Sequence, residues 1–191
     1  MLKWLIRNRL TAFETRFGYD VTYARELLAS DLGAFMAYAR LDRLSRYRKD
    51  VPREVYYAAK LPAVVEEDCG PCTQLTVAMA LADGVDPRTI ATILEGIEAV
   101  MSPEVRLGYQ FARATLAHDV AADPLRDEIV RRWGPRALAS LAFGIAAGRV
   151  FPTIKYALGH GKACARIDVA GEPVMPLRSS VTPAAVLRAL S

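Results

Sequence analysis

The sequence predicts an all-α fold in a single domain, and three observations support this. Apolar residues recur at helical spacing along most of the chain, and no stretch of comparable length alternates with period two. The 191 residues, 52% of them hydrophobic, are enough to bury one core. An oxygen-bearing residue stands directly before a proline at several places, which is typical of helix starts. These places are Asp86-Pro87, Ser102-Pro103, Asp123-Pro124 and Thr182-Pro183.

Residues 1–50 are expected to form N-terminal helices. Apolar residues at helical spacing from Leu2 to Phe17 predict the first, which Gly18 ends. We interpret its apolar stripe as core-facing, with a membrane-surface helix as the alternative. A second helix is expected from Thr22 as cap to Ala39. The basic run at 43–49 is interpreted as its solvated end, where positive charge suits the helix dipole.

A third helix is expected to open at Asp50 and Pro52, and a fourth at Gly70 or Pro71, stopping at Gly84. Later helices are predicted over 90–100, 105–122, 125–133 and 137–151. Only residues 165–169 are predicted to be extended.

The predicted helix over 137–151 carries Ser140, Gly144 and Gly148 on one ridge, where a neighbouring backbone can approach closely. A central helix of the bundle is the favoured interpretation, and a contact between subunits is the alternative.

The most distinctive motif is Cys69-Gly70-Pro71-Cys72, at the start of the fourth predicted helix. Unpaired N–H groups and the positive end of a helix dipole stabilise a thiolate, which lowers a thiol pKa from about 8.5 towards 7 or below. Two intervening residues also permit a tight disulfide. The motif therefore predicts a dithiol/disulfide switch.

Charge and hydropathy exclude several classes of protein. The net charge is +4, and no basic tract is interleaved with aromatic residues, so nucleic acid is not an expected partner. The longest charge-free run, residues 69–82, is shorter than the roughly 18 apolar residues that a membrane span needs. Lys3 and Arg7 interrupt the N-terminal apolar residues too early for a signal peptide. A cytoplasmic location is expected, where the three cysteines indicate chemistry rather than a disulfide framework.

A helical chain in which Cys-x-x-Cys opens a helix, followed by a helix pair and an Ala/Gly-rich helix, resembles the alkylhydroperoxidase D and carboxymuconolactone decarboxylase superfamily. The resemblance covers residues 51–163, and residues 164–191 form a C-terminal tail. It implies an all-α bundle, a homo-oligomer such as a trimer or hexamer, and thiol-dependent reduction of a peroxide or a small disulfide, with a thiol as reductant. The catalytic residues would be Cys69 and Cys72, with no cofactor and no metal.

Two positions depart from the family pattern. Members with active cysteines carry His four residues after the second Cys, where this chain has Thr76, and Glu about twelve before the first, where it has Tyr57. The proton relay of the family is therefore not intact. Glu54 lies one helical turn before Tyr57 and is the candidate replacement, and the acidic residues at 66–68 are also near in sequence.

Cys-Gly-Pro-Cys is also similar to the thioredoxin signature. The residues before the motif are predicted as helix rather than as a buried strand, so the thioredoxin fold is rejected. The similarity still supports a reversible disulfide. Which cysteine attacks stays open, because the helix-dipole argument favours Cys69, as the more N-terminal and more exposed one, and the resemblance favours Cys72.

Other interpretations stay open. The two cysteines are alternatively half of a zinc site completed by His160 and Cys164, or simply buried small residues. His118 lies on an apolar stripe and is interpreted as a core histidine rather than a base. At the level of the whole protein, the alternatives are a non-catalytic helical scaffold and a decarboxylase-like lyase.

Overall fold

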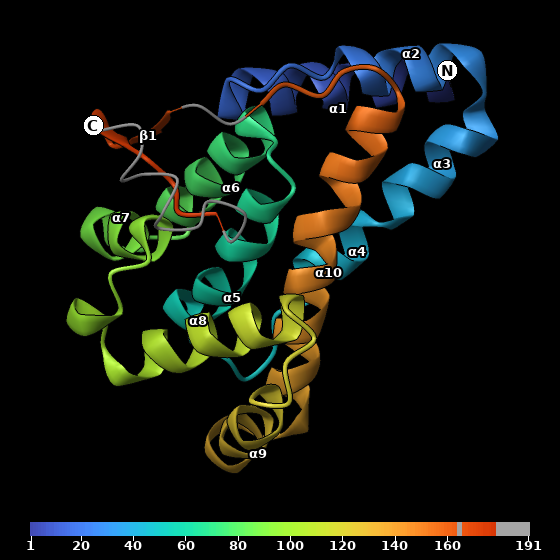
Figure 1. Cartoon of the computed structure of the whole chain (residues 1–191). Helices are drawn as coiled ribbons and strands as arrows, with labels where there is room; N and C mark the ends of the chain where they lie inside the picture. Colours follow the sequence, from blue (N-terminus) through green and yellow to red (C-terminus); the bar gives the residue numbers. More distant parts are fainter. Residues whose placement is uncertain (164–165, 179–191) are drawn as a thin grey trace.

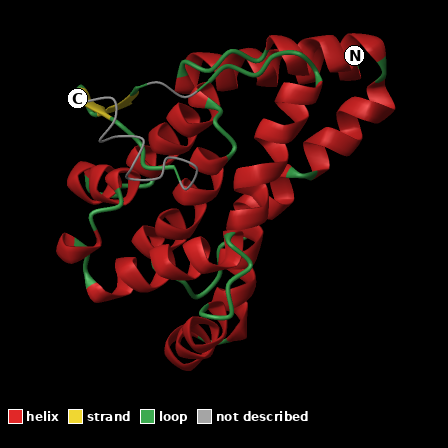
Figure 2. Cartoon of the chain, viewed as in Figure 1, coloured by secondary structure: helices red, strands yellow, loops and turns green. Residues whose placement is uncertain are grey.

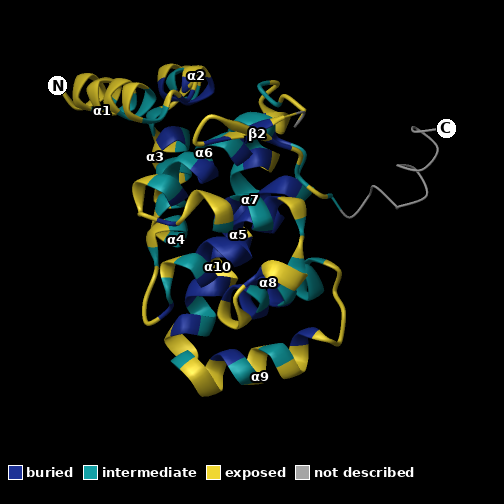
Figure 3. Cartoon of the chain, turned by 90° about the vertical axis from the view of Figure 1, so that its left-hand side faces the viewer, coloured by how far each residue is buried: buried dark blue, intermediate teal, exposed yellow. Residues whose placement is uncertain are grey.

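Helix α5 (Arg53–Glu66) lies at the centre of the computed structural model, which describes residues 1–163 and 166–178 (Figure 1). Every residue from Val55 to Val65 is buried, and dark blue in Figure 3 is concentrated on α5 and the adjoining helices. The predicted all-α, single-domain fold is confirmed. Figure 2 shows one short hairpin at the edge of an otherwise helical structure.

The most extensive contacts with α5 come from four helices, which bring the C-terminal two thirds of the described chain around it. They are α6 (Gly70–Ala82), α7 (Pro87–Glu95), α8 (Pro103–Leu116) and α10 (Pro135–Ala157). Helix α9 (Ala122–Trp133) packs on α8 and α10, away from α5 (Figure 1). The predicted helix starts at Gly70, Pro87 and Pro103 are confirmed, and α10 begins at Pro135, two residues before the predicted start.

Glycines allow the neighbouring helices to approach the backbone of α5. A Cβ on Gly148 of α10 would lie 3.0 Å from Lys60 O, and a Cβ on Gly108 of α8 would lie 2.8 Å from Val55 O. Gly144 lies against the ring of Tyr56. The ridge over 140–148 therefore packs within the chain, which confirms the central-helix interpretation. Because this ridge is covered by α5, it no longer supports a homo-oligomer, which rests on the family resemblance alone.

The N-terminal helices build a second, smaller core. They are α1 (Leu2–Phe17), α2 (Thr22–Ser30), α3 (Leu32–Arg40) and α4 (Asp42–Arg46). As predicted, α1 ends at Gly18, which has φ of 59°. The stripe on α1 is only partly core-facing, since Phe13 and Phe17 pack on this core while Leu2, Trp4 and Leu5 are exposed.

Three predicted boundaries were wrong for local reasons. The helix expected from 22 to 39 is divided at Asp31, whose carboxylate accepts from Ala34 N and so caps α3 instead. The helix expected through residue 100 ends at Gly96, which has φ of 69°, and a short 3-10 helix (Glu98–Val100) follows. Helix α9 begins one residue before Asp123, so this residue pairs with Arg126 rather than capping the helix.

Other boundaries also differ from the predictions. Helix α8 ends at Leu116 rather than at residue 122, and α10 continues through Pro152 to Ala157. The extended piece is confirmed at β1 (Ile167–Val169), which pairs antiparallel with β2 (Glu172–Val174), a strand that the sequence did not indicate. The helix start predicted at Thr182-Pro183 lies outside the described residues.

Within the described ranges, one helix is long and apolar enough to cross a membrane, and it is α10. The core helix of a bundle passes the same test, and α10 packs along α5 through Gly144 and Gly148. Its length and composition are therefore weak support for a membrane span.

We predict that Gly148→Leu lowers the free energy of unfolding by about 3 kcal/mol, because a larger side chain must separate α10 from the backbone of α5. Ala146→Leu, at an exposed position on the same helix, should change it by less than about 0.5 kcal/mol. Chemical denaturation measures both values. Equal effects of the two changes would contradict the packing described for this ridge.

A second prediction concerns Lys60, which is buried in the middle of α5. Burial lowers the pKa of Lys60 from 10.5 to about 8, with Asp42 and Asp83 opposing the shift and Arg48 adding to it. The unfolded chain then binds this proton more tightly, so folding becomes more favourable as pH rises from about 8 towards 10.5. Between pH 7 and pH 9.5, the free energy of unfolding of the wild type should gain about 2 kcal/mol relative to Lys60→Met.

The control for this measurement is Lys3→Met, which removes an exposed lysine. Denaturation curves of this variant should follow the wild type across the pH range. If the stability of Lys60→Met also runs parallel to the wild type, Lys60 does not lose its proton in the folded protein over this range.

Candidate functional site

Cys69 and Cys72 form a disulfide at the start of α6, with their Cα atoms 5.3 Å apart. Cys69 is the N-cap residue in an extended conformation, and Cys72 lies in the first turn after Gly70 and Pro71. The predicted pairing at a helix N-terminus is therefore confirmed, and it is compatible with redox chemistry. Cys69 is 0% exposed and Cys72 is 5% exposed, so the expectation that Cys69 is the more exposed cysteine was wrong.

The chain that follows α10 lies against the N-terminal end of α6, where the disulfide is. Gly70 N donates to Lys162 O at 3.0 Å, so this segment lies against the first residue of α6. One turn further on, the side chain of Gln74 makes two hydrogen bonds with the backbone of Asp168, at 2.8 and 2.9 Å. Because both cysteines are buried, a reactant reaches the sulfurs only if neighbouring residues move.

Tyr19 is the polar side chain that reaches the disulfide. Its Oη lies 3.9 Å from Cys72 Sγ, and because a disulfide sulfur carries no hydrogen, the hydroxyl is the donor. Tyr19 directly follows Gly18, whose left-handed conformation ends α1 and turns the chain back towards α6. The ring packs in the small core with Phe13 and Tyr23.

Lys155 of α10 lies behind Tyr19. Its Nζ donates to Tyr19 Oη at 3.3 Å and lies 4.4 Å from the centre of that ring. The side chain also lies over the ring of Tyr23, at 5.2 Å, and the residue is 3% exposed. Since the ammonium only donates, the hydroxyl proton of Tyr19 stays available for the sulfur. Lys155, Tyr19 and Cys72 thus form a chain of polar contacts.

The groups around these three residues keep Tyr19 neutral and make the charged form of Lys155 less favourable than it is in water. Burial raises the pKa of Tyr19, with Tyr23 and Asp20 adding to the effect, so the hydroxyl stays protonated. Burial lowers the pKa of Lys155; the charge of Asp20 opposes this, and the charge of Lys162 adds to it. Hydrogen bonds from Thr22 lower the pKa of Asp20, which is therefore ionised. A negative charge that forms on Cys72 would be stabilised by both the hydroxyl and the ammonium.

The three acidic residues before the motif form ion pairs with arginines from three different parts of the chain. Each acidic residue pairs with a different element: α8, α10 or the segment after the hairpin. The pairs are Glu66 with Arg113 at 2.5 Å, Glu67 with Arg149 at 2.7 Å, and Asp68 with Arg178 at 2.5 Å. These residues fix the turn between α5 and α6, which is a structural role.

The structure does not bring Glu54 together with the cysteines. Its carboxylate lies 3.7 Å from Arg53 Nε in the first turn of α5, and Cys69 follows the opposite end, about 18 Å away along the helix. At the two positions where the family pattern has Glu and His, Tyr57 donates to Asp83 Oδ2 at 2.7 Å and Thr76 donates to Cys72 O at 2.9 Å. A catalytic role for Glu54 stays a prediction that no contact of this geometry supports.

The histidines are placed differently from their predicted roles. His118 is exposed in the turn after α8, with φ of 54°, so its interpretation as a core residue was wrong. His160 Nε2 lies 2.8 Å from Glu26 Oε2, which gives it a partner other than a metal. Cys164, the last member of the zinc alternative, lies outside the described residues, and among the described ones no three His, Cys, Asp or Glu side chains gather as metal ligands.

Sequence reasoning missed Tyr19 and Lys155. Tyr19 follows Gly18, which the sequence indicates only as a helix end, and Lys155 lies beyond the helix predicted over 137–151, whereas the structure places it inside α10. The available signal was that apolar residues continue past Pro152 on both sides of Lys155, which indicates that the helix extends and that the stem of this lysine lies along an apolar surface.

Comparisons with known proteins give no relative for this chain: no family model, no curated protein and no solved structure matches it.

We predict that Tyr19→Phe raises the pKa of the Cys72 thiol in the reduced protein by about one unit, because a hydrogen bond to a charged group contributes about 1.5 kcal/mol. The rate of alkylation against pH, followed by mass spectrometry of the Cys72 peptide, measures this pKa. Tyr109→Phe, which removes a buried hydroxyl from α8, is the control and should leave the profile unchanged. Identical profiles for all three proteins would remove Tyr19 from the site.

Proposed function

We propose that this protein is a thiol-dependent oxidoreductase, and specifically a peroxidase of the alkylhydroperoxidase D kind. The observation that carries the proposal is the disulfide at the N-terminus of α6, with the Tyr19 hydroxyl at Cys72 Sγ and the Lys155 ammonium behind it. This arrangement stabilises a thiolate on Cys72 more than on Cys69. It therefore favours Cys72 as the attacking residue, in agreement with the family resemblance.

In the proposed reaction, the Cys72 thiolate attacks the terminal oxygen of a hydroperoxide and breaks the O–O bond. The products are a sulfenic acid on Cys72 and an alkoxide, which takes one proton to become the alcohol. The Cys69 thiolate then attacks the Cys72 sulfur, forms the disulfide and releases hydroxide, which is protonated to water. Two electrons pass from the two thiols to the peroxide. A dithiol or two monothiols return the electrons and regenerate both cysteines.

Tyr19 and Lys155 would replace the Glu and His of the family pattern. The hydroxyl donates to the thiolate, and the ammonium supplies positive charge and a proton route to the leaving alkoxide. This relay comes from the end of α1 and from α10 instead of from α5 and α6. We further propose a cytoplasmic homo-oligomer, on the basis of the resemblance and the three cysteines.

A second candidate is a helical scaffold with an inert disulfide. The burial of both sulfurs favours it, because an enzyme must give its reactant access to one of them. The two candidates differ in whether the reduced protein consumes peroxide.

The deciding experiment is stopped-flow measurement of disulfide formation after peroxide is added to the reduced protein. The proposal predicts one disulfide per chain for the wild type and none for Cys69→Ser or Cys72→Ser. Cys72→Ser should leave Cys69 unoxidised, whereas Cys69→Ser should stop at the sulfenic acid on Cys72. If neither peroxide nor a small disulfide oxidises the reduced wild type, the scaffold is the correct description.

The same experiment separates the two possible relays. Tyr19→Phe and Lys155→Met should slow disulfide formation by about tenfold or more, since general acid–base help contributes roughly 10²- to 10⁴-fold. Glu54→Gln should stay within about twofold of the wild type, because its carboxylate lies at the far end of α5. A slow Glu54→Gln together with a normal Tyr19→Phe would instead support the role of Glu54 that the sequence suggested.

A further inference from the structure

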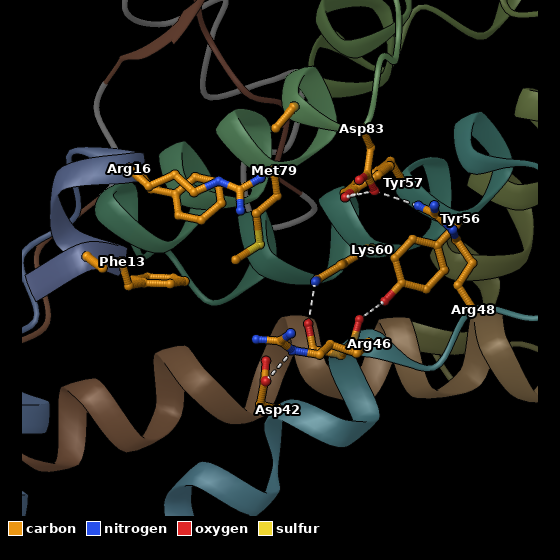
Figure 4. A pocket seen from close by; sticks show the side chains of 14 residues that line it. Phe13, Arg16, Asp42, Arg46, Arg48, Tyr56, Tyr57, Lys60, Met79 and Asp83 are labelled. Atoms are coloured by element: carbon orange, nitrogen blue, oxygen red, sulfur yellow. Dashed lines mark hydrogen bonds and ion pairs between the residues drawn. The ribbon is translucent and has the colours of Figure 1, made fainter. Parts of the chain in front are cut away.

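A pocket of about 540 Å³ opens between α1, α4, α5 and the C-terminal end of α6, and neither cysteine lines it (Figure 4). Its volume lies within the range of sites for small molecules. Cationic side chains line one part of its wall and apolar side chains line another. None of these side chains takes part in the proposed peroxidase reaction.

Lys60 points into this pocket from the middle of α5 (Figure 4). Its Nζ donates to Ser45 Oγ at 2.7 Å and lies 5.7 Å from the centre of the Tyr56 ring, and the residue is 5% exposed. An ammonium has three N–H donors, and Ser45 is its one hydrogen-bond acceptor among the described residues. Two donors of a buried cation are therefore left for a further partner.

The charges lining the pocket do not cancel. Asp42 pairs with Arg46, and Asp83 accepts from Arg48 at 2.6 Å and from Tyr57 at 2.7 Å. Although burial opposes it, these hydrogen bonds lower the pKa of Asp83, so its carboxylate is ionised and neutralised by Arg48.

Arg16 and Lys60 have no carboxylate partner in the part of the chain that the structure describes, although both line the pocket. The four cations and two carboxylates of the lining leave a surplus of two positive charges. Two negative charges on a ligand would balance it.

The opposite wall is apolar and partly aromatic. Phe13 and Phe17 of α1 contact each other with ring centres 4.9 Å apart, and Met79 of α6 lies beside them on the pocket wall. On the cationic wall, the ring of Tyr56 turns its face towards the ammonium of Lys60. A ligand that fits both walls carries its charge at one end and an apolar or aromatic body at the other.

We propose that this pocket binds a small organic phosphate monoester with an aromatic body, whose phosphate contacts Lys60 and Ser45 and whose body lies against Phe13 and Met79. The dianionic phosphate matches the surplus of two positive charges better than a carboxylate does. Arg16, on α1, adds a further positive charge to the lining of the pocket. The site is separate from the disulfide and does not depend on the peroxidase proposal.

Three probes with the same ring and different charge test this assignment: phenyl phosphate, benzoate and phenol. Phenyl phosphate should bind the oxidised wild-type protein at least tenfold more tightly than benzoate, and phenol should bind more weakly still. Inorganic phosphate should also bind at least tenfold more weakly than phenyl phosphate, since it lacks the aromatic body. The methyl resonance of Met79 should shift on titration, while that of Met101, which is buried elsewhere, should not.

Variants then locate the phosphate. Lys60→Met and Arg16→Met should each weaken phenyl phosphate binding at least tenfold, whereas Lys3→Met removes one exposed charge from α1 and should change it less than twofold. Circular dichroism establishes that each variant is folded. Equal binding of benzoate and phenyl phosphate, equal binding of inorganic phosphate, or an unchanged affinity in Lys60→Met would each overturn the proposal.

Discussion

The close approach of two helices to the backbone of α5 is the constraint on which the rest of the structure depends. At Gly108 and Gly148 a side chain would overlap carbonyl oxygens of α5, so α8 and α10 lie nearer to it than ordinary side chains allow. Residues 55–65 are consequently all buried. Helix α5 therefore cannot shift or rotate unless α8 and α10 separate from it. The segments that join its two ends are consequently held in fixed positions.

The position of the disulfide depends on the position of α5. The three acidic residues after α5 pair with arginines of α8, α10 and the C-terminal segment, so the turn into α6 is held from three sides before any contact of the sulfurs is considered. Individual exposed ion pairs contribute little to stability, but these converge on one turn. The residues after α10 contact the same end of α6: Lys162 O accepts from Gly70 N, and the hairpin is joined to α6 through Gln74 and packs into the core through Ile167 and Val169. The N-terminal end of α6, and the disulfide with it, is therefore held by contacts from several parts of the chain.

Sequence patterns predicted the fold class, most helix starts and the cysteine pair, because these depend on local chemistry. Proline after an oxygen-bearing cap and glycine at a helix end act within one turn, and their signals at Gly18, Asp86 and Ser102 were reliable. They failed where two local signals compete, as at Asp31, where a capping carboxylate interrupts a continuous apolar stripe. Tyr19 is 53 residues from Cys72, and Lys155 is 136 residues from Tyr19. No periodicity within one helix reports such contacts, which arise only when α1, α6 and α10 meet.

The two buried lysines connect the fold to both candidate sites. Leucine or methionine at either position would avoid the free energy of placing an ammonium in a poorly hydrated environment. Lys155 is partly compensated by two aromatic faces and by Asp20, and Lys60 by a hydroxyl, one ring and two more distant carboxylates. Neither forms an ion pair within the described ranges. Such groups concentrate at functional sites, because a cation without a permanent partner can stabilise a charge that appears only during reaction or binding. By this reasoning, Lys155 would stabilise a thiolate that exists only during the reaction, and Lys60 would stabilise a bound anion. The loss of stability at both positions has the same cause, which is the burial of an ammonium.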